Sequence, residues 1–112
     1  MPTLTHALFY KLDDSHTPIP VEDPVDWAKW METHKGGRVV DRSEVGGFLV
    51  STVFLGLDHD HTGRAGPILF ETMVFRSDKS PNQFDTYQER YKTWEEAELG
   101  HAQAVEYVRN RL

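Results

Sequence analysis

One stretch of this sequence, Phe48–Leu57, constrains the fold more than any other because it is apolar on both faces that a strand would present. Only Ser51, Thr52 and Gly56 interrupt it. Strands with one solvated face alternate between apolar and polar residues, whereas strands covered on both faces read as continuous apolar runs. The sequence therefore predicts a central strand here, with neighbouring strands on either side of it.

Four further segments have the alternation of strands and can supply those neighbours. They are Leu4–Leu12, Arg38–Ser43, Ile68–Arg76 and Phe84–Tyr91, the last of which we expect at an edge of the sheet. The proline-rich stretch Ser15–Pro24 is expected to be an extended loop, because residues that precede proline avoid the helical region.

Two amphipathic helices complete the predicted fold. Asp23–Pro24 is typical of a helix start, and the helical spacing that follows ends at Gly36–Gly37. Thr93 and Glu96 have the spacing of a capping box at the start of the last helix. The order β-α-β-β-β-β-α predicts a single α+β domain over residues 1–112, with a four- to five-stranded, mainly antiparallel sheet and both helices packed on it.

Composition excludes several classes of function. The chain contains no cysteine, which rules out disulfides, thiolate zinc sites, iron–sulfur clusters and cysteine nucleophiles. Its 12 Lys and Arg against 18 Asp and Glu give a net charge of −6 with no basic stripe, which argues against non-specific binding to nucleic acid. No apolar run approaches the roughly 20 residues of a membrane span, and the first residues lack a signal-peptide pattern. We therefore expect a soluble protein of the cytosol.

The polar run Asp58-His59-Asp60-His61 leaves the predicted central strand and contains residue types that bind divalent metals. Neighbours in an extended chain point in opposite directions, so the run offers two separate pairs of ligands and no third ligand. The alternative is a solvated loop in which Asp58 and Asp60 form Asx turns. We expect no cofactor, and no metal that folding requires. Arg64 could instead help to bind an anion, although its surroundings lack the spacing of a phosphate-binding loop.

Glu71 and His101 are predicted to form a buried pair. Glu71 shares a strand face with apolar neighbours, where a lone carboxylate is unfavourable, and His101 lies in the apolar stripe of the last helix. Such a pair could be a general base with its orienting acid, or could only fix how helix and sheet dock. If Leu57 pairs with Pro67, Glu71 lies opposite Val53, about 13 Å from the polar loop. The pair and the loop are therefore expected to be separate sites.

Three blocks of the sequence resemble a family of small uncharacterised proteins of bacteriophages and prophages. The blocks are Val50–His59, Gly66–Phe75 and Tyr91–His101, and the resemblance spans roughly residues 27–108. In that family the Asp-His of the loop is followed by Asn and an aromatic residue, where this chain has Asp60 and His61. The positions that match the family pattern are Asp58, His59, Glu71, Trp94, Glu95 and His101. The resemblance implies a phage setting and no particular activity.

Together these observations favour a small binding or interaction protein, because the sequence has no complete set of catalytic residues. We expect it to engage a host or phage protein, such as a host or defence factor that it modulates, or to bind a small ligand. One alternative is a metal-dependent hydrolase built on the Asp58–His59 loop. A second is a self-assembling phage component, in which an edge strand or the Trp-containing helix forms a homo-oligomer.

Overall fold

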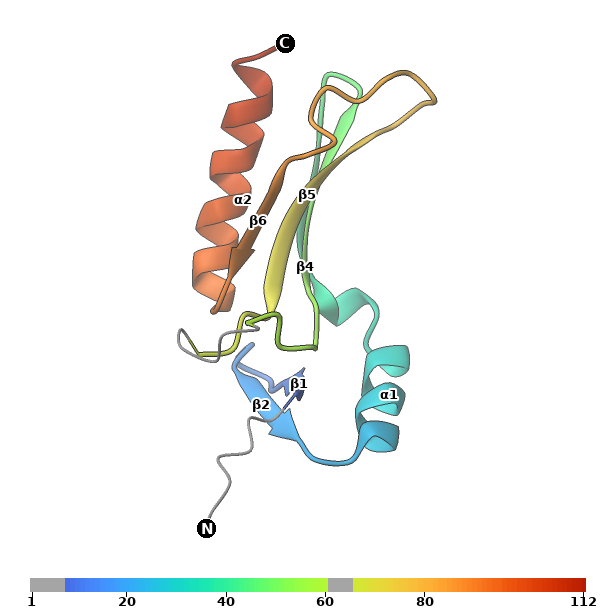
Figure 1. Cartoon of the computed structure of the whole chain (residues 1–112), viewed down its shortest axis with the longest axis vertical. Coiled ribbons are helices and arrows are strands. Elements are labelled where there is room, and N and C mark those ends of the chain that lie inside the picture. The colour runs from blue at the N-terminus through green and yellow to red at the C-terminus, as the bar shows by residue number, and fades with distance from the viewer. Residues whose placement is uncertain (1–7, 61–65) are drawn as a thin grey trace.

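The chain forms a four-stranded sheet, a separate two-stranded sheet and two α-helices in this computed structural model, which describes residues 8–60 and 66–112 (Figure 1). The elements are β1 (Phe9–Leu12), β2 (Pro18–Val21), α1 (Pro24–Thr33), a short 3-10 helix (Gly36–Arg38), β3 (Val39–Val45), β4 (Phe48–Phe54), β5 (Phe70–Arg76), β6 (Gln88–Tyr91) and α2 (Trp94–Arg109). The predicted α+β class is confirmed. No helix in the described ranges has the length and apolar character needed to span a membrane.

The main sheet is an antiparallel meander in the order β3-β4-β5-β6, so β4 is an interior strand and β6 an edge strand, as predicted. Gly46 and Gly47 join β3 to β4 with φ angles of 53° and 86°. Positive φ at both positions is the geometry of the tight hairpin turn that matches the twist of a sheet. Between β4 and β5, Val53 is the partner of Glu71, which confirms the predicted register.

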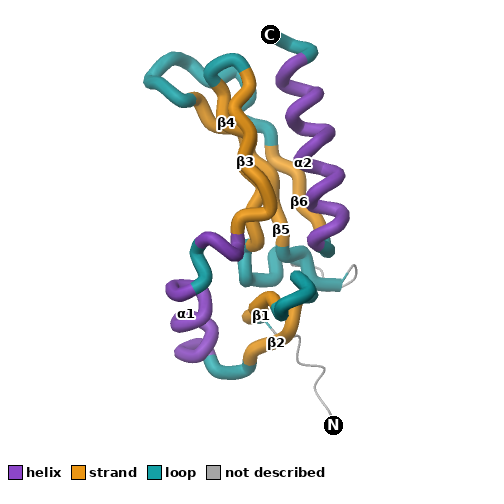
Figure 2. Tube along the Cα trace, turned by 180° about the vertical axis from the view of Figure 1, so that it is seen from behind, coloured by secondary structure: helices purple, strands orange, loops and turns teal. Residues whose placement is uncertain are grey.

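Helix α2 lies on one face of this sheet (Figures 1 and 2). It begins with the predicted capping box, in which the Thr93 hydroxyl accepts from the Glu96 backbone N–H and the Glu96 carboxylate accepts from the Lys92 N–H. Its buried positions are Ala97, Gly100, His101, Ala104 and Val108. Four of these five are small or medium apolar residues, which let the helix approach the sheet closely.

Two apolar clusters form the core between α2 and the sheet. One contains Val45, Phe48, Val50, Val74, Phe84, Ala104 and Val108. The other contains Leu12, Phe54, Leu69, Phe70 and Ala97. Thr52, Thr72 and His101 are also buried, and by position along β4, β5 and α2 they lie between the two clusters. The core is therefore apolar at both ends and polar in the middle.

The N-terminal part differs from the prediction. β1 pairs with β2, which occupies part of the stretch Ser15–Pro24 that was expected to be a loop. Asp23 caps α1 by accepting from the Val25 N–H, as predicted, but α1 packs on β1 and β2 beside the end of the main sheet (Figure 2). The prediction that both helices cover one sheet is therefore wrong for α1. Of the predicted first strand, residues 4–7 lie outside the described residues.

Candidate functional site

Glu71 lies on the face of the sheet that points away from α2, so the predicted Glu71–His101 pair is wrong. Its carboxylate accepts from Nε of Arg90 at 3.0 Å and from Nε2 of Gln88 at 2.9 Å, and both partners belong to β6. The face under α2 instead carries Phe70, Thr72 and Val74, which are all buried. Glu71 is thus paired within the sheet, and His101 has other partners.

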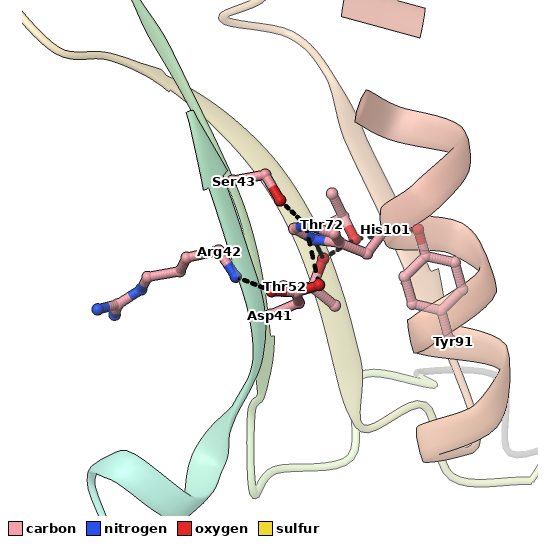
Figure 3. Close-up of polar contacts among 7 residues, drawn as sticks. All are labelled: Asp41, Arg42, Ser43, Thr52, Thr72, Tyr91 and His101. Atoms are coloured by element: carbon pink, nitrogen blue, oxygen red, sulfur yellow. Dashed lines mark hydrogen bonds and ion pairs between the residues drawn. The ribbon is translucent and has the colours of Figure 1, made fainter. Parts of the chain in front are cut away.

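His101 belongs to a chain of buried polar side chains (Figure 3). Its Nδ1 lies 2.7 Å from the Thr52 hydroxyl and its Nε2 lies 2.9 Å from the Ser43 hydroxyl. The Thr52 and Thr72 hydroxyls are 2.5 Å apart, and the Tyr91 hydroxyl donates to Thr72 at 3.1 Å. We call these five residues the polar cluster. Sequence reasoning placed His101 in the buried face of its helix but missed its four partners.

One arrangement of protons satisfies the whole polar cluster with a neutral His101. Tyr91 donates to Thr72, and a hydroxyl can accept one proton while it donates its own, so Thr72 can donate to Thr52 and Thr52 to Nδ1 of His101. The one proton of the neutral imidazole is then on Nε2, facing the Ser43 hydroxyl. The hydrogen bonds are therefore consistent with a neutral His101.

Burial acts in the same direction. His101 is only 3% exposed, and burial lowers its pKa below the ordinary value of 6.5. The carboxylate of Asp41, 3.7 Å from Nε2, raises the pKa and partly opposes that effect. Asp41 is itself largely exposed, and water screens its charge. His101 is therefore neutral at pH 7 and acts as a hydrogen-bond partner.

The polar cluster is poorly arranged for catalysis. A serine hydroxyl beside an imidazole is the contact that activates a nucleophile, and Ser43 and His101 have it. However, the other imidazole nitrogen bonds the Thr52 hydroxyl instead of an orienting carboxylate. Grooves of about 490, 400 and 270 Å³ in the described part of the chain are lined by neither Ser43, Thr52 nor His101. None of these three grooves therefore opens onto the imidazole.

The polar loop is held by its own backbone. Oδ1 of Asp58 accepts from the Asp60 N–H at 2.8 Å and from the Ile68 N–H at 3.0 Å, and Nδ1 of His59 bonds the Leu57 carbonyl at 2.8 Å. This is the predicted Asx-turn alternative. His61 and Arg64 lie outside the described residues. Among residues 8–60 and 66–112, no group of three His, Cys, Asp or Glu side chains is placed to share a metal ion.

The groove of about 490 Å³ lies between the β1–β2 hairpin and the end of α1, and Trp30 is one of its lining residues. His16 stands at the hairpin turn with φ 63°, and its ring stacks on Trp94 at 3.7 Å. Trp30 and His34 stack one helical turn apart on α1. Both imidazoles therefore stack on tryptophan rings. His16 links the β1–β2 hairpin to Trp94 of α2, and His34 is the C-cap residue of α1.

The opposite face of the main sheet carries apolar side chains that no described helix covers (Figures 1 and 2). In the register of β4 and β5 these are Leu49, Val53, Met73 and Phe75, around a small central Ser51. Phe75 is 46% exposed. Polar and charged residues of the same face surround them: Arg42, Glu44, Glu71, Gln88 and Arg90. We call this surface the open face.

The open face corrects the expectation that the central strand is covered on both faces. The run Phe48–Leu57 is apolar on both faces, but α2 covers only the face of Phe48, Val50, Thr52 and Phe54. Comparison with known proteins adds nothing that assigns this surface a role, because the chain matches no protein-family model, no curated protein and no solved structure. Its function has to be argued from the geometry.

Proposed function

We propose that this chain is a non-catalytic binding protein that acts through the open face of its sheet, in the cytosol of a bacterial host and in the phage setting that its sequence resembles. The observation that carries the proposal is the uncovered apolar centre of that face, with Phe75 46% exposed among Leu49, Val53 and Met73. Contiguous apolar patches rimmed by polar residues are typical of interaction sites.

The edges of the sheet favour binding through the face over binding by strand addition. β3 has the charged residues Asp41, Arg42 and Glu44, and β6 is only four residues long. Charged and short edge strands are the usual protection against strand pairing with another chain. A partner therefore gains more by covering the open face, where each fully buried large apolar side chain contributes about 1.5–3 kcal/mol.

The alternative of a metal-dependent hydrolase has less support. The Asp58 carboxylate accepts from two backbone N–H groups, and His59 bonds a carbonyl with one ring nitrogen. The Ser43–His101 contact lies under α2, and the imidazole has no carboxylate partner on Nδ1 to orient it. A self-assembling component is compatible with the proposal, since the open face can bind another protein or another copy.

The test compares the wild type with Phe75→Glu and with Leu99→Glu as the matched control. Leu99 is a large exposed apolar residue on α2, 63% exposed and away from the open face. Each tagged chain is purified from host cells and its complexes are weighed by native mass spectrometry. We expect a complex, with itself or with another protein, that Phe75→Glu abolishes and Leu99→Glu leaves intact.

Two results would overturn the proposal. One is a complex that Phe75→Glu leaves unchanged, because the open face would then not be the binding surface. The other is a stoichiometric metal ion that is lost in His59→Ala, which would restore the hydrolase alternative. Circular dichroism of each variant checks that the substitutions have not unfolded the chain.

A further inference from the structure

We infer that the partner covering the open face is a second copy of this chain, an inference that rests on the proposed function. The two sheets would pack face to face as a β-sandwich, with α2 of each copy on the outside. Sheets that pack in this way keep their strands within about 30° of each other and lie about 10 Å apart. Two observations support a second copy over an unrelated partner, and the size of the surface sets the expected affinity.

The first observation is the charge of the open face. Its two arginines, Arg42 and Arg90, equal its two carboxylates, Glu44 and Glu71, so the face has no net charge. The whole chain has a net charge of −6, which therefore lies on the other surfaces. Two copies therefore repel each other when their other, negatively charged surfaces meet, but not when their open faces meet. A strongly charged partner has nothing on this face to attract it, whereas an identical neutral face fits.

The second observation is the register of the sheet. Leu49 is the Cα partner of Phe75, and Ser51 is the partner of Met73. A two-fold axis that runs along the strands, between β4 and β5, sets β4 of one copy over β5 of the other. Leu49 then lies over Phe75 of the other copy, and Ser51 over Met73. The small Ser51 side chain leaves room for the long methionine. The same axis sets Val53 over Glu71, whose carboxylate is already bonded by Gln88 and Arg90.

The same axis keeps like charges apart. It sets β3 of one copy over β6 of the other, and the rows of the sheet then place Arg42 opposite the neutral Gln88. An axis perpendicular to the strands that passes through the Ser51 row would set β3 over β3 and bring the two Arg42 side chains together. Of these two arrangements, the charge pattern favours the axis along the strands.

The size of the surface sets the expected affinity. β3, β4 and β5 are seven residues long and β6 is four, so the outline of the sheet face is at most about 24 by 19 Å. Interfaces of this small size belong to transient complexes. We therefore expect a reversible dimer with a dissociation constant in the micromolar range.

The test is sedimentation of the purified chain over about 5–500 µM, a range that spans the expected dissociation constant. The wild type should shift from monomer to dimer across it. Phe75→Glu should weaken dimerisation at least tenfold, because two carboxylates would be buried in the interface. Leu99→Glu should dimerise as the wild type does. A wild type that stays monomeric throughout overturns the inference, and so does a Phe75→Glu variant that dimerises normally.

A charge reversal gives a second test that does not depend on core packing. Arg42→Glu makes the open face net negative on both copies, and Arg42 is an exposed edge-strand residue. Lys29→Glu, on the exposed surface of α1, changes the net charge by the same amount away from the face. Arg42→Glu should weaken dimerisation at low salt, and dimerisation of this variant should return at high salt, because salt screens the repulsion between the two negative faces. Equal effects of the two reversals would contradict the assigned interface.

The two proposals fail in different ways. If the purified chain is monomeric but complexes from cells depend on Phe75, the second copy is wrong and the binding function stands. If the purified chain dimerises and Phe75→Glu has no effect on that dimer, the open face is not the dimer interface and the second-copy inference is wrong. The proposed function then fails only if the complexes from cells are also unaffected by Phe75→Glu.

Discussion

Replacing His101 by leucine tests the polar cluster directly. Leucine has a similar volume and suits a helix interior, so the change leaves little cavity and removes mainly two hydrogen bonds, to Thr52 and Ser43. A net hydrogen bond contributes about 1 kcal/mol, so we expect His101→Leu to lower the free energy of unfolding by about 2 kcal/mol. Thr52 keeps Thr72 as a partner and the half-buried Ser43 can reach water, which limits the loss.

Thr52→Val completes a double-mutant cycle. It removes the hydroxyl that bonds Nδ1 of His101 and leaves that buried nitrogen without a hydrogen-bond partner, which costs about 1–3 kcal/mol. In the double variant the shared hydrogen bond is lost only once. The double loss should therefore be smaller than the sum of the single losses by about 1 kcal/mol.

Urea unfolding at pH 7.5, followed by circular dichroism, measures each free energy. The cycle of His101→Leu with Glu71→Gln is the control, because Glu71 lies on the other face of the sheet and bonds Gln88 and Arg90. Those two losses should add within about 0.5 kcal/mol. Additive losses for His101 with Thr52, or strong coupling of His101 with Glu71, would refute the placement of α2 on the sheet.

Three further predictions follow from the same geometry. Burial lowers the pKa of His101 below 6.5, so as the pH falls the unfolded chain binds a proton at this residue before the folded chain does. The contribution of the neutral His101 to the free energy of unfolding is therefore present above pH 6.5 and is lost as the pH falls below it. Unfolding measured at a series of pH values should show this loss in the wild type and not in His101→Leu. Gly100→Ala should lower the free energy of unfolding by about 1–2 kcal/mol despite the helix preference of alanine, because the new Cβ would collide with the Tyr91 ring; a thermal melt that rises would contradict this close approach. Asp58→Ala should lower the free energy of unfolding by about 1–2 kcal/mol, because the Asp60 and Ile68 N–H groups lose the carboxylate that accepts from them. A chelator should change the melting temperature of the wild type by no more than about 2 °C.

Local signals in the sequence predicted local structure well. Asp23 and Thr93 cap their helices through side-chain oxygens, as their positions before Pro24 and Glu96 indicate. The register of β4 and β5 was also predicted correctly, from the assumption that Leu57 pairs with Pro67 where the two strands meet their connecting loop. These features depend on residues within one element or one hairpin, so the sequence contains the necessary information.

The face that α2 covers could not be predicted in the same way. Alternation shows that Glu71 and Thr72 point in opposite directions, but both faces of β5 carry apolar side chains, so it does not say which face is buried. A lone threonine such as Thr72 is more often exposed than buried, unless a hydrogen-bond partner such as Thr52 satisfies its hydroxyl. The predicted register already pairs Thr52 with Thr72, and this buried pair is the signal that could have located the partners of His101.

Strand β2 was missed because proline marks loops more often than strands. Pro18 and Pro20 are two residues apart, so both missing N–H groups point to the same edge. That edge is free in the two-stranded sheet, and pairing with β1 can use the residues between and after the prolines. A proline at every second position is therefore compatible with an edge strand.

The meander order of the main sheet has a consequence for folding speed. Each strand pairs with the next strand along the chain, so the longest connection that has to close in the main sheet is residues 55–69, between β4 and β5. The β3–β4 hairpin closes through only Gly46 and Gly47, which makes it the least costly contact to form first. We expect substitutions in this hairpin to slow folding, and substitutions in α1 to accelerate unfolding, when rates are measured by stopped-flow fluorescence. A chain of this kind would reach its native sheet before the N-terminal hairpin and α1 dock at its end.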